Sequence, residues 1–214
     1  CSYVLEWHAR VPFWRDHYFG LDQDAHYAFL RKQLQVLSWL RGPRRWVLKT
    51  PQHLEQLGPL MRTFPDATIA LTLRDPVAVL QSAITMLAWG DRLRRRAVEP
   101  DELAAYWIDR IERLLRASVR DLHLVPTERR VDVEFGGFMA DELGTVSRIL
   151  EVAGLGVPAR TRDELAAYIA GNPRGKNGRV IYDLRRDFHL DPGRVRERFR
   201  FYFEAFPGIR EEVH

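Results

Sequence analysis

The chain has 214 residues, of which 46% are hydrophobic and 11% aromatic, so it can bury the core of an α/β domain and is not intrinsically disordered. Its net charge of +4 favours anionic partners weakly, such as nucleotides or sulfated and phosphorylated ligands. The sequence has no apolar run long enough to span a membrane and no secretory signal pattern. Its single cysteine, Cys1, excludes an internal disulfide and fits the reducing cytoplasm.

Helical stripes and short apolar strands alternate in the first part of the chain. Apolar residues recur at steps of three and four within residues 1–42, as in amphipathic helices, and Gly42-Pro43 ends this region. A strand, a helix and a second strand follow, and the second strand is apolar on both faces, as a buried parallel strand is. Their predicted ranges are 45–49, 53–64 and 67–73.

The second part of the chain continues this alternation. The predicted ranges are 90–100 (basic loop), 102–122 (helix), 131–135 (strand), 139–153 and 164–170 (helices), 171–178 (loop) and a last helix opened by Asp191-Pro192. Strands that alternate with helices predict an α/β fold with a parallel sheet and right-handed crossovers. We expect residues 1–214 to form a single domain.

The stretch Leu71–Ser82 places an arginine where an apolar strand ends and a helix begins. Asp75 suits the N-cap of that helix, and Pro76 suits its first turn. Ligands bind at the carboxyl ends of parallel strands, and a helix N-terminus favours anions. Ser82 lies two turns further along, opposite the apolar stripe, where it is free to face the same ligand as Arg74. The alternative is that Arg74 pairs with a carboxylate and that Ser82 faces solvent.

The predicted strand 45–49 ends in a lysine, and a histidine follows one helical turn later. Lys49 is placed to neutralise charge on a transferring group. His53 is placed to take a proton from a hydroxyl nucleophile near neutral pH. The alternative for His53 is a surface histidine early in a helix.

The late segment GNPRGKNGR combines glycines with basic side chains, including Arg174, Gly175 and Lys176. Glycines let the backbone approach an oxyanion, and the basic side chains can close over it. The segment does not match the phosphate loop GxxxxGK[ST], which occurs nowhere in the chain, so a solvated basic loop is the alternative. The histidines lack metal-ligand spacing, so we expect no metal. Glutamates and core aromatics interleave the arginine runs, so we expect no nucleic-acid partner.

Taken together, the three clusters resemble the bacterial sulfotransferases that use 3′-phosphoadenosine 5′-phosphosulfate. The family pattern is WVLKxPxHL…FPDAxIxxxxRDPxxVxxS. The chain carries WVLKTPQHL at residues 46–54, FPDA at 64–67, RDP at 74–76 and then Ser82. The order and spacing make this resemblance more specific than any single motif, and it extends over most of the chain. It implies a three-layer, P-loop-NTPase-like α/β fold.

The resemblance also implies roles for individual residues. Arg74 and Ser82 match the pair that binds the 3′-phosphate of the nucleotide, and the segment 174–176 resembles one that closes over that phosphate. Lys49 matches a lysine that stabilises the sulfuryl group. His53 is similar to a catalytic base, but it lies two residues further along than in the animal cytosolic motif Lys-Thr-His. The donor nucleotide is a co-substrate, and the reaction requires no metal.

The chain departs from the family pattern in two places. The loop for the 5′-phosphosulfate, of the type Pro-Lys/Arg-Ser-Gly-Thr, is absent. We expect this loop and its strand to precede Cys1 in a longer protein, so that this chain alone binds the nucleotide poorly and does not turn over. The favoured explanation for Cys1 is an internal position, and the alternative is the lipidated terminus of a lipoprotein. Phe135-Gly136-Gly137 replaces Tyr-Glu-Asp, so Phe135 keeps a stacking surface for adenine without the hydroxyl.

The sequence therefore predicts a cytoplasmic sulfotransferase that acts on a hydroxyl or amine of a small molecule, a carbohydrate or a lipid. A P-loop-like kinase and a basic nucleic-acid-binding module are the alternatives. The aromatic-rich N-terminal helices could line an apolar acceptor pocket or pack against a partner subunit, so the sequence also allows a homo-oligomer.

Overall fold

The computed structural model describes residues 4–173, 175, 176, 178, 180–211 and 213. Its contacts separate the chain into two compact units. The first, here called the helical unit, comprises Cys1–Asp66 and Glu112–Leu124. The second, here called the sheet unit, comprises Ala67–Ile111 and Val125–His214. Each unit is described by itself, and the single domain expected over residues 1–214 stays a prediction.

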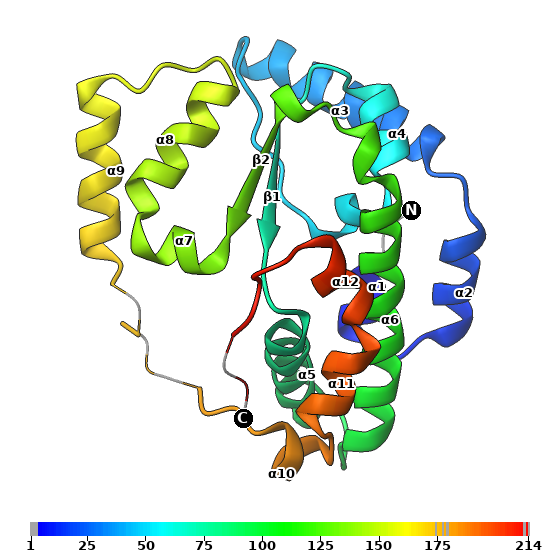
Figure 1. Ribbon diagram of the computed structural model, residues 1–214. Helices are drawn as coiled ribbons and strands as arrows, with labels where there is room; N and C mark the ends of the chain where they lie inside the picture. Colours follow the sequence, from blue (N-terminus) through cyan, green and yellow to red (C-terminus); the bar gives the residue numbers. More distant parts are fainter. Residues whose placement is uncertain (1–3, 174, 177, 179, 212, 214) are drawn as a thin grey trace. The chain divides into compact units, whose positions relative to one another are not determined.

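The helical unit contains helices and no strand among its described residues (Figure 1). They are α1 (Val4–His8), α2 (Pro12–Gly20), α3 (Asp24–Arg41), the 3₁₀ helix η1 (Pro51–Glu55), α4 (Leu57–Thr63), the second half of α6 (Pro100–Asp121) and the 3₁₀ helix η2 (Leu122–Leu124). The helices predicted within residues 1–42 are confirmed. Gly42 follows α3 with a φ of +81°, a conformation that favours glycine and ends the helix.

Two predictions in the helical unit are wrong. Residues 45–49 form no strand. A strand forms when its backbone N–H and C=O groups are hydrogen-bonded to a neighbouring strand, and within the described residues no strand lies beside this segment. The helix predicted over 53–64 is divided, because Gln56 leaves the helical region (φ −131°, ψ 32°) between η1 and α4. Lys49 therefore lies in a segment without regular secondary structure, and His53 lies in a 3₁₀ turn.

The sheet unit contains two parallel strands, β1 (Ile69–Leu73) and β2 (Arg130–Glu134), paired from Ile69 with Arg130 to Leu73 with Glu134. The helices of this unit are α5 (Pro76–Arg92), the first half of α6, the 3₁₀ helix η3 (Thr127–Arg129), α7 (Phe135–Ala140), α8 (Glu142–Val152), α9 (Ala159–Gly171), α10 (Leu184–Phe188), α11 (Pro192–Arg198) and α12 (Arg200–Ala205). The α/β class with a parallel sheet is confirmed.

Two details of the sheet unit differ from the predictions. The second predicted strand is not buried on both faces, because Leu71 and Leu73 of β1 are buried while Ala70 and Thr72 are exposed. The helix predicted over 139–153 is divided into α7 and α8. Asp141 separates them, and its carboxylate caps α8 by accepting a hydrogen bond of 2.8 Å from the backbone N–H of Gly144.

The start of α5 follows the prediction closely. The Asp75 carboxylate accepts a hydrogen bond of 2.9 Å from the backbone N–H of Val77, and Pro76 occupies the first turn. Val77, Leu80 and Ile84 are fully buried along one face of the helix. This apolar face fixes α5 against its unit, and Ser82 lies outside it.

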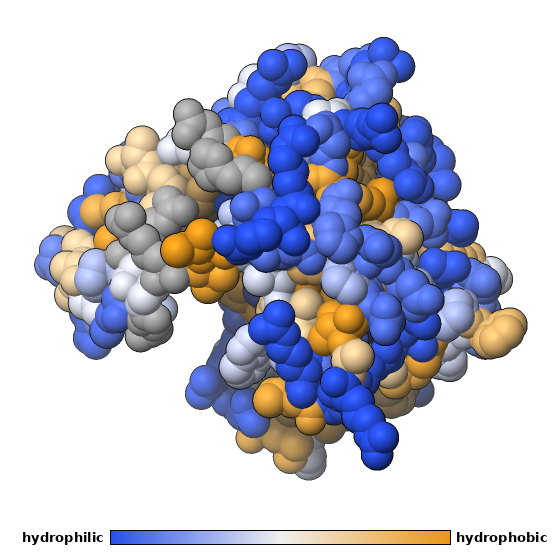
Figure 2. Space-filling view, turned by 90° about the horizontal axis from the view of Figure 1, so that it is seen from below, coloured by the Kyte–Doolittle hydropathy of each residue, from blue (hydrophilic) through white to orange (hydrophobic). Residues whose placement is uncertain are grey.

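Figure 2 shows one face, on which exposed apolar side chains form separate patches among hydrophilic ones. Within the described ranges, no helix combines the length and the hydrophobicity that crossing a membrane requires.

Candidate functional site

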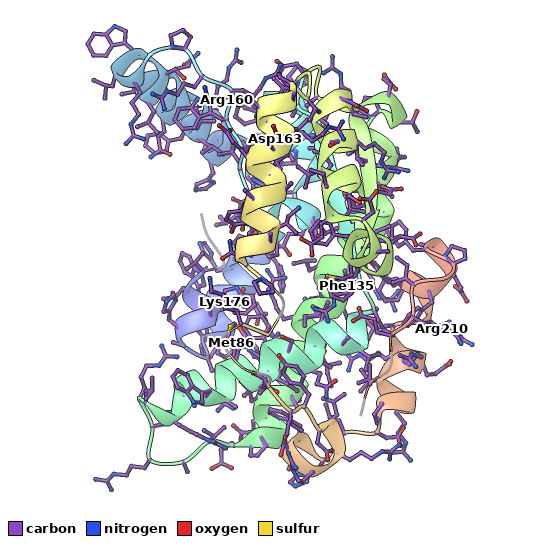
Figure 3. The ribbon with its side chains drawn as sticks, turned by 90° about the vertical axis from the view of Figure 1, so that its left-hand side faces the viewer. Met86, Phe135, Arg160, Asp163, Lys176 and Arg210 are labelled. Atoms are coloured by element: carbon purple, nitrogen blue, oxygen red, sulfur yellow. The ribbon has the colours of Figure 1, made fainter. Side chains whose placement is uncertain are left out.

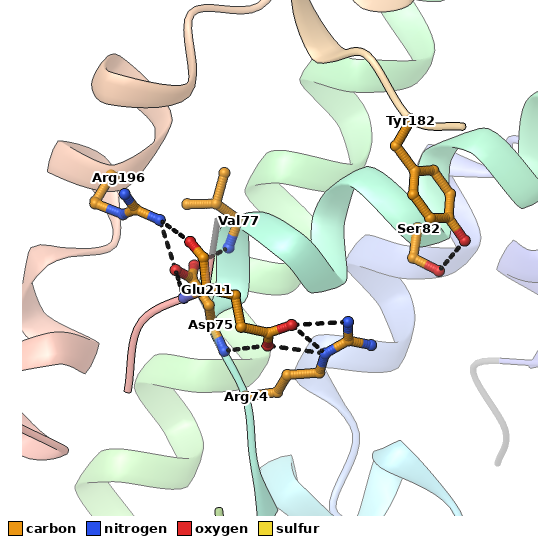
Figure 4. Close-up of polar contacts among 7 residues, drawn as sticks. All are labelled: Arg74, Asp75, Val77, Ser82, Tyr182, Arg196 and Glu211. Atoms are coloured by element: carbon orange, nitrogen blue, oxygen red, sulfur yellow. Dashed lines mark hydrogen bonds and ion pairs between the residues drawn. The ribbon is translucent and has the colours of Figure 1, made fainter. Parts of the chain in front are cut away.

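Arg74 lies between the end of β1 and the N-terminus of α5, and its guanidinium is paired with a carboxylate (Figure 4). Its Nε and Nη2 each donate to Glu211 at 2.9 Å, which gives a bidentate ion pair. The backbone N–H of Asp75 donates to the same carboxylate at 3.3 Å. The guanidinium also lies 4.2 Å from the ring centroid of Phe135. This pairing is the alternative that the sequence left open for Arg74.

Asp75 connects Arg74 to the C-terminal segment. Its side chain is fully buried, and its Oδ2 accepts hydrogen bonds from Arg196 and from the backbone N–H of Glu211. Arg196 also donates to the backbone carbonyl of Glu211 at 3.3 Å. Two cations and two carboxylates thus form one cluster, in which the backbone of Glu211 is held independently of its side chain.

Ser82 lies two helical turns beyond Asp75 and is half-buried. Its Oγ is 3.4 Å from the hydroxyl oxygen of Tyr182, which follows the glycine-rich loop (Figure 4). Ser82 therefore faces a side chain as well as solvent, and its role in binding a ligand stays a prediction.

The glycine-rich basic loop is described only in part, and Arg174 lies outside the described residues. Gly175 and Gly178 have φ angles of +82° and +95°, which side chains other than glycine rarely adopt. Lys176 lies beyond the C-terminal end of α9 (Figure 3), and its Nζ donates to the carbonyl of Gly171 at 2.9 Å. A cation at this position stabilises the end of the helix.

Lys49 and His53 lie in the helical unit. Lys49 is exposed, and Thr50 caps η1 by accepting a hydrogen bond from the backbone N–H of Gln52 at 3.3 Å. His53 Nδ1 shares a hydrogen bond of 2.7 Å with the hydroxyl of Tyr27. Burial lowers the pKa of His53, so the imidazole is neutral at pH 7.

The environment of Tyr27 explains why it remains a neutral phenol. Burial raises its pKa, and the negative charge of Glu55 raises it further. Glu55 is itself buried and accepts a hydrogen bond of 2.8 Å from the hydroxyl of Tyr18. His53 is therefore held by a polar network and is not the surface histidine that the alternative describes.

The structure gives the predicted residues separate partners. In the described part of the sheet unit, Arg74 is hydrogen-bonded to Glu211, Ser82 to Tyr182 and Lys176 to the end of α9, and no hydrogen bond joins Arg74, Ser82 and Lys176 to one another. No motif in the sequence marks Glu211, Tyr182 or Tyr27 as a partner of the predicted residues. Of these, only Tyr182 lies near a segment that the sequence marks as functional.

Two separate groups of donors in the sheet unit are of kinds that suit an oxyanion. One is the guanidinium of Arg74 with the backbone N–H of Asp75 at a helix N-terminus, and the other is the pair of hydroxyl groups of Ser82 and Tyr182. Among the residues that the structure describes, no three His, Cys, Asp or Glu side chains are grouped so that they could hold a metal ion.

Comparisons with known proteins point to one family. The model of the "Sulfotransferase family" matches residues 3–159. No curated protein sequence matches significantly. The sulfotransferase STF9 from Mycobacterium avium is 22% identical with a TM-score of 0.79, over 91% of this chain and 50% of that one. The sulfotransferase STF1 from Mycobacterium tuberculosis H37Rv is 27% identical with a TM-score of 0.77, over 92% of this chain and 51% of that one. The chain thus spans about half the length of these two structures.

Proposed function

The chain belongs to the sulfotransferase family, and from this premise we propose that it transfers a sulfuryl group from 3′-phosphoadenosine 5′-phosphosulfate to a hydroxyl or amine acceptor. One observation carries the proposal: the guanidinium of Arg74 and the backbone N–H of Asp75 together hold an anion, the carboxylate of Glu211. A phosphate presents oxygens to the same donors with a higher charge. The proposed ligand of this site is the 3′-phosphate of the nucleotide.

The position of Ser82 supports this assignment. Along an α-helix, the seven residues from Asp75 to Ser82 correspond to about 10.5 Å and almost two full turns, so both residues face the same side of α5. A phosphate between an extended arginine side chain and the serine hydroxyl is compatible with this separation. Lys176 is the further cation proposed for the site, together with Arg174, which lies outside the described residues.

The proposed chemistry is an in-line displacement. The acceptor oxygen or nitrogen forms a bond to sulfur while the bond from sulfur to the bridging oxygen of the nucleotide breaks, and adenosine 3′,5′-bisphosphate leaves. We assign Lys49 to neutralise the charge on the transferring group and His53 to take the proton of the acceptor. The lowered pKa of His53 supports this role, because only a neutral imidazole can accept a proton.

Further parts of the proposal rest on the sequence. The acceptor is a small molecule, a carbohydrate or a lipid, and the single cysteine supports a cytoplasmic location. No observation in the structure favours the kinase or the nucleic-acid-binding module. A nucleic-acid-binding module would bind nucleic acid with an affinity that falls steeply as the salt concentration rises, and it would need no 3′-phosphate.

The proposal is tested by calorimetry with adenosine 3′,5′-bisphosphate and adenosine 5′-phosphate, which lacks only the 3′-phosphate. We expect the bisphosphate to bind at least about tenfold more tightly, because charge-assisted hydrogen bonds contribute roughly 1.5–3 kcal/mol. Arg74→Ala should abolish this preference and Ser82→Ala should reduce it. Arg160→Ala, at an exposed arginine of α9 paired with Glu164, is the matched control. Equal binding of the two nucleotides contradicts the proposal.

A further inference from the structure

The contact between the hydroxyl groups of Ser82 and Tyr182 is a long hydrogen bond that leaves part of the hydrogen-bonding capacity of both groups unfilled. The two oxygens are 3.4 Å apart, whereas a good O–H···O hydrogen bond measures about 2.7–2.8 Å. Within the described residues, neither hydroxyl has another hydrogen-bond partner in the structure. Each can therefore still donate a full-strength hydrogen bond to a third oxygen.

The backbone next to Tyr182 is anchored. Asp183 caps α10 by accepting a hydrogen bond of 2.9 Å from the backbone N–H of Arg186, and Leu184 is fully buried. Val180 and Ile181, which precede Tyr182, are exposed, while Tyr182 itself is half-buried with its hydroxyl directed at α5 (Figure 4). The backbone of Tyr182 is thus fixed next to α10, whose N-cap, Asp183, follows directly and whose first helical residue, Leu184, lies two residues later.

Two hydroxyl groups at this separation suit a single anionic acceptor. An oxygen at ordinary hydrogen-bond distance from both, about 2.7 Å, fits between donors that are 3.4 Å apart. Because the pair is neutral and half-buried, it gains most from an acceptor that carries charge. Among the groups of the proposed nucleotide, the 3′-phosphate assigned to Ser82 is such an acceptor.

We propose that Tyr182 is a nucleotide-binding residue whose hydroxyl, together with that of Ser82, donates to the 3′-phosphate of the sulfuryl donor. This inference rests on the proposed function and adds a residue that no motif in the sequence marks. It also gives the segment after the glycine-rich loop a direct role: the nucleotide connects this segment to α5.

The test compares Tyr182→Phe with the unaltered chain, using adenosine 3′,5′-bisphosphate and adenosine 5′-phosphate in calorimetry. Loss of one hydrogen bond to a charged group should weaken binding of the bisphosphate about tenfold and leave that of the monophosphate unchanged. Phenylalanine retains the ring, and thermal unfolding confirms that the variant is folded. Tyr168→Phe, at an exposed tyrosine of α9 in the same unit, is the matched control and should change neither affinity.

A double-mutant cycle with Ser82→Ala sharpens the test, because two donors to one phosphate should show a coupling beyond the sum of the single losses. If Tyr182→Phe binds the bisphosphate normally while Arg74→Ala does not, the role of Tyr182 is refuted and the proposed function stands. If Tyr182→Phe weakens both nucleotides equally, the hydroxyl does not contact the 3′-phosphate, and the inference is again refuted. If the unaltered chain shows no preference for the 3′-phosphate, both proposals fail.

Discussion

Glu211 occupies the donors that we assign to the nucleotide, so replacing it should strengthen nucleotide binding. A phosphate that binds Arg74 must first displace the carboxylate, which accepts hydrogen bonds from two nitrogens of the guanidinium and from the backbone N–H of Asp75. Glu211→Gln removes the charge and keeps the length of the side chain. The backbone of Glu211 keeps its own hydrogen bonds to Asp75 and Arg196, so the segment should stay in place.

The size of the effect follows from the exposure of the pair. The side chains of Arg74 and Glu211 are 36% and 22% exposed, between a surface pair and a buried one. Exposed pairs contribute about 0–1 kcal/mol, and hydrogen bonds to charged groups contribute about 1.5–3 kcal/mol. A value of about 1 kcal/mol predicts about fivefold tighter binding of adenosine 3′,5′-bisphosphate. The same substitution should lower the free energy of unfolding by a similar amount.

Calorimetry and urea unfolding measure these two opposite effects on the same variant. Glu204→Gln is the control, because Glu204 pairs with Arg200 at 3.9 Å on an exposed part of α12, and it should alter neither quantity by more than about 0.5 kcal/mol. Weaker or unchanged nucleotide binding by Glu211→Gln would show that Glu211 and the nucleotide do not compete for Arg74. The assignment of Arg74 to the phosphate would then lose its main support.

Two further predictions concern stability. Burial lowers the pKa of His53, so the unfolded chain binds a proton at this residue more readily than the folded chain, and the free energy of unfolding should fall as the pH drops below about 6.5. Urea unfolding of His53→Gln should show a smaller fall with pH than the unaltered chain. An identical fall in the two proteins contradicts the argument. Asp75→Asn should lower the free energy of unfolding by about 3 kcal/mol, because it leaves Arg196 without its buried charged partner. A loss below about 1 kcal/mol in urea unfolding would show that the ion pair between Asp75 and Arg196 does not stabilise the fold.

Local signals explain which parts of the fold could be predicted. The start of α5 was predicted correctly because Asp75, Pro76 and the apolar stripe act within a few residues of one another. The strand predicted at residues 45–49 was wrong because a strand depends on a distant partner, which an apolar pattern does not reveal.

The same distinction applies to the candidate site. Arg74 and Ser82 belong to a local pattern, and their positions beside the strand end and along α5 follow from it. Glu211 lies 137 residues from Arg74, and Tyr182 lies 100 residues from Ser82. No spacing rule connects residues so far apart, so their partners required the structure.

The charge of the cluster around α5 limits how a nucleotide can bind. Arg74, Arg196, Asp75 and Glu211 together carry no net charge, so a phosphate added to this cluster would meet two carboxylates. Asp75 cannot leave, because its side chain is fully buried and caps α5. Glu211 can leave, because its side chain is partly exposed and its backbone is held separately. A nucleotide that binds as we propose would therefore exchange with the Glu211 carboxylate, and the strength of that one ion pair would set how much of its affinity for Arg74 remains.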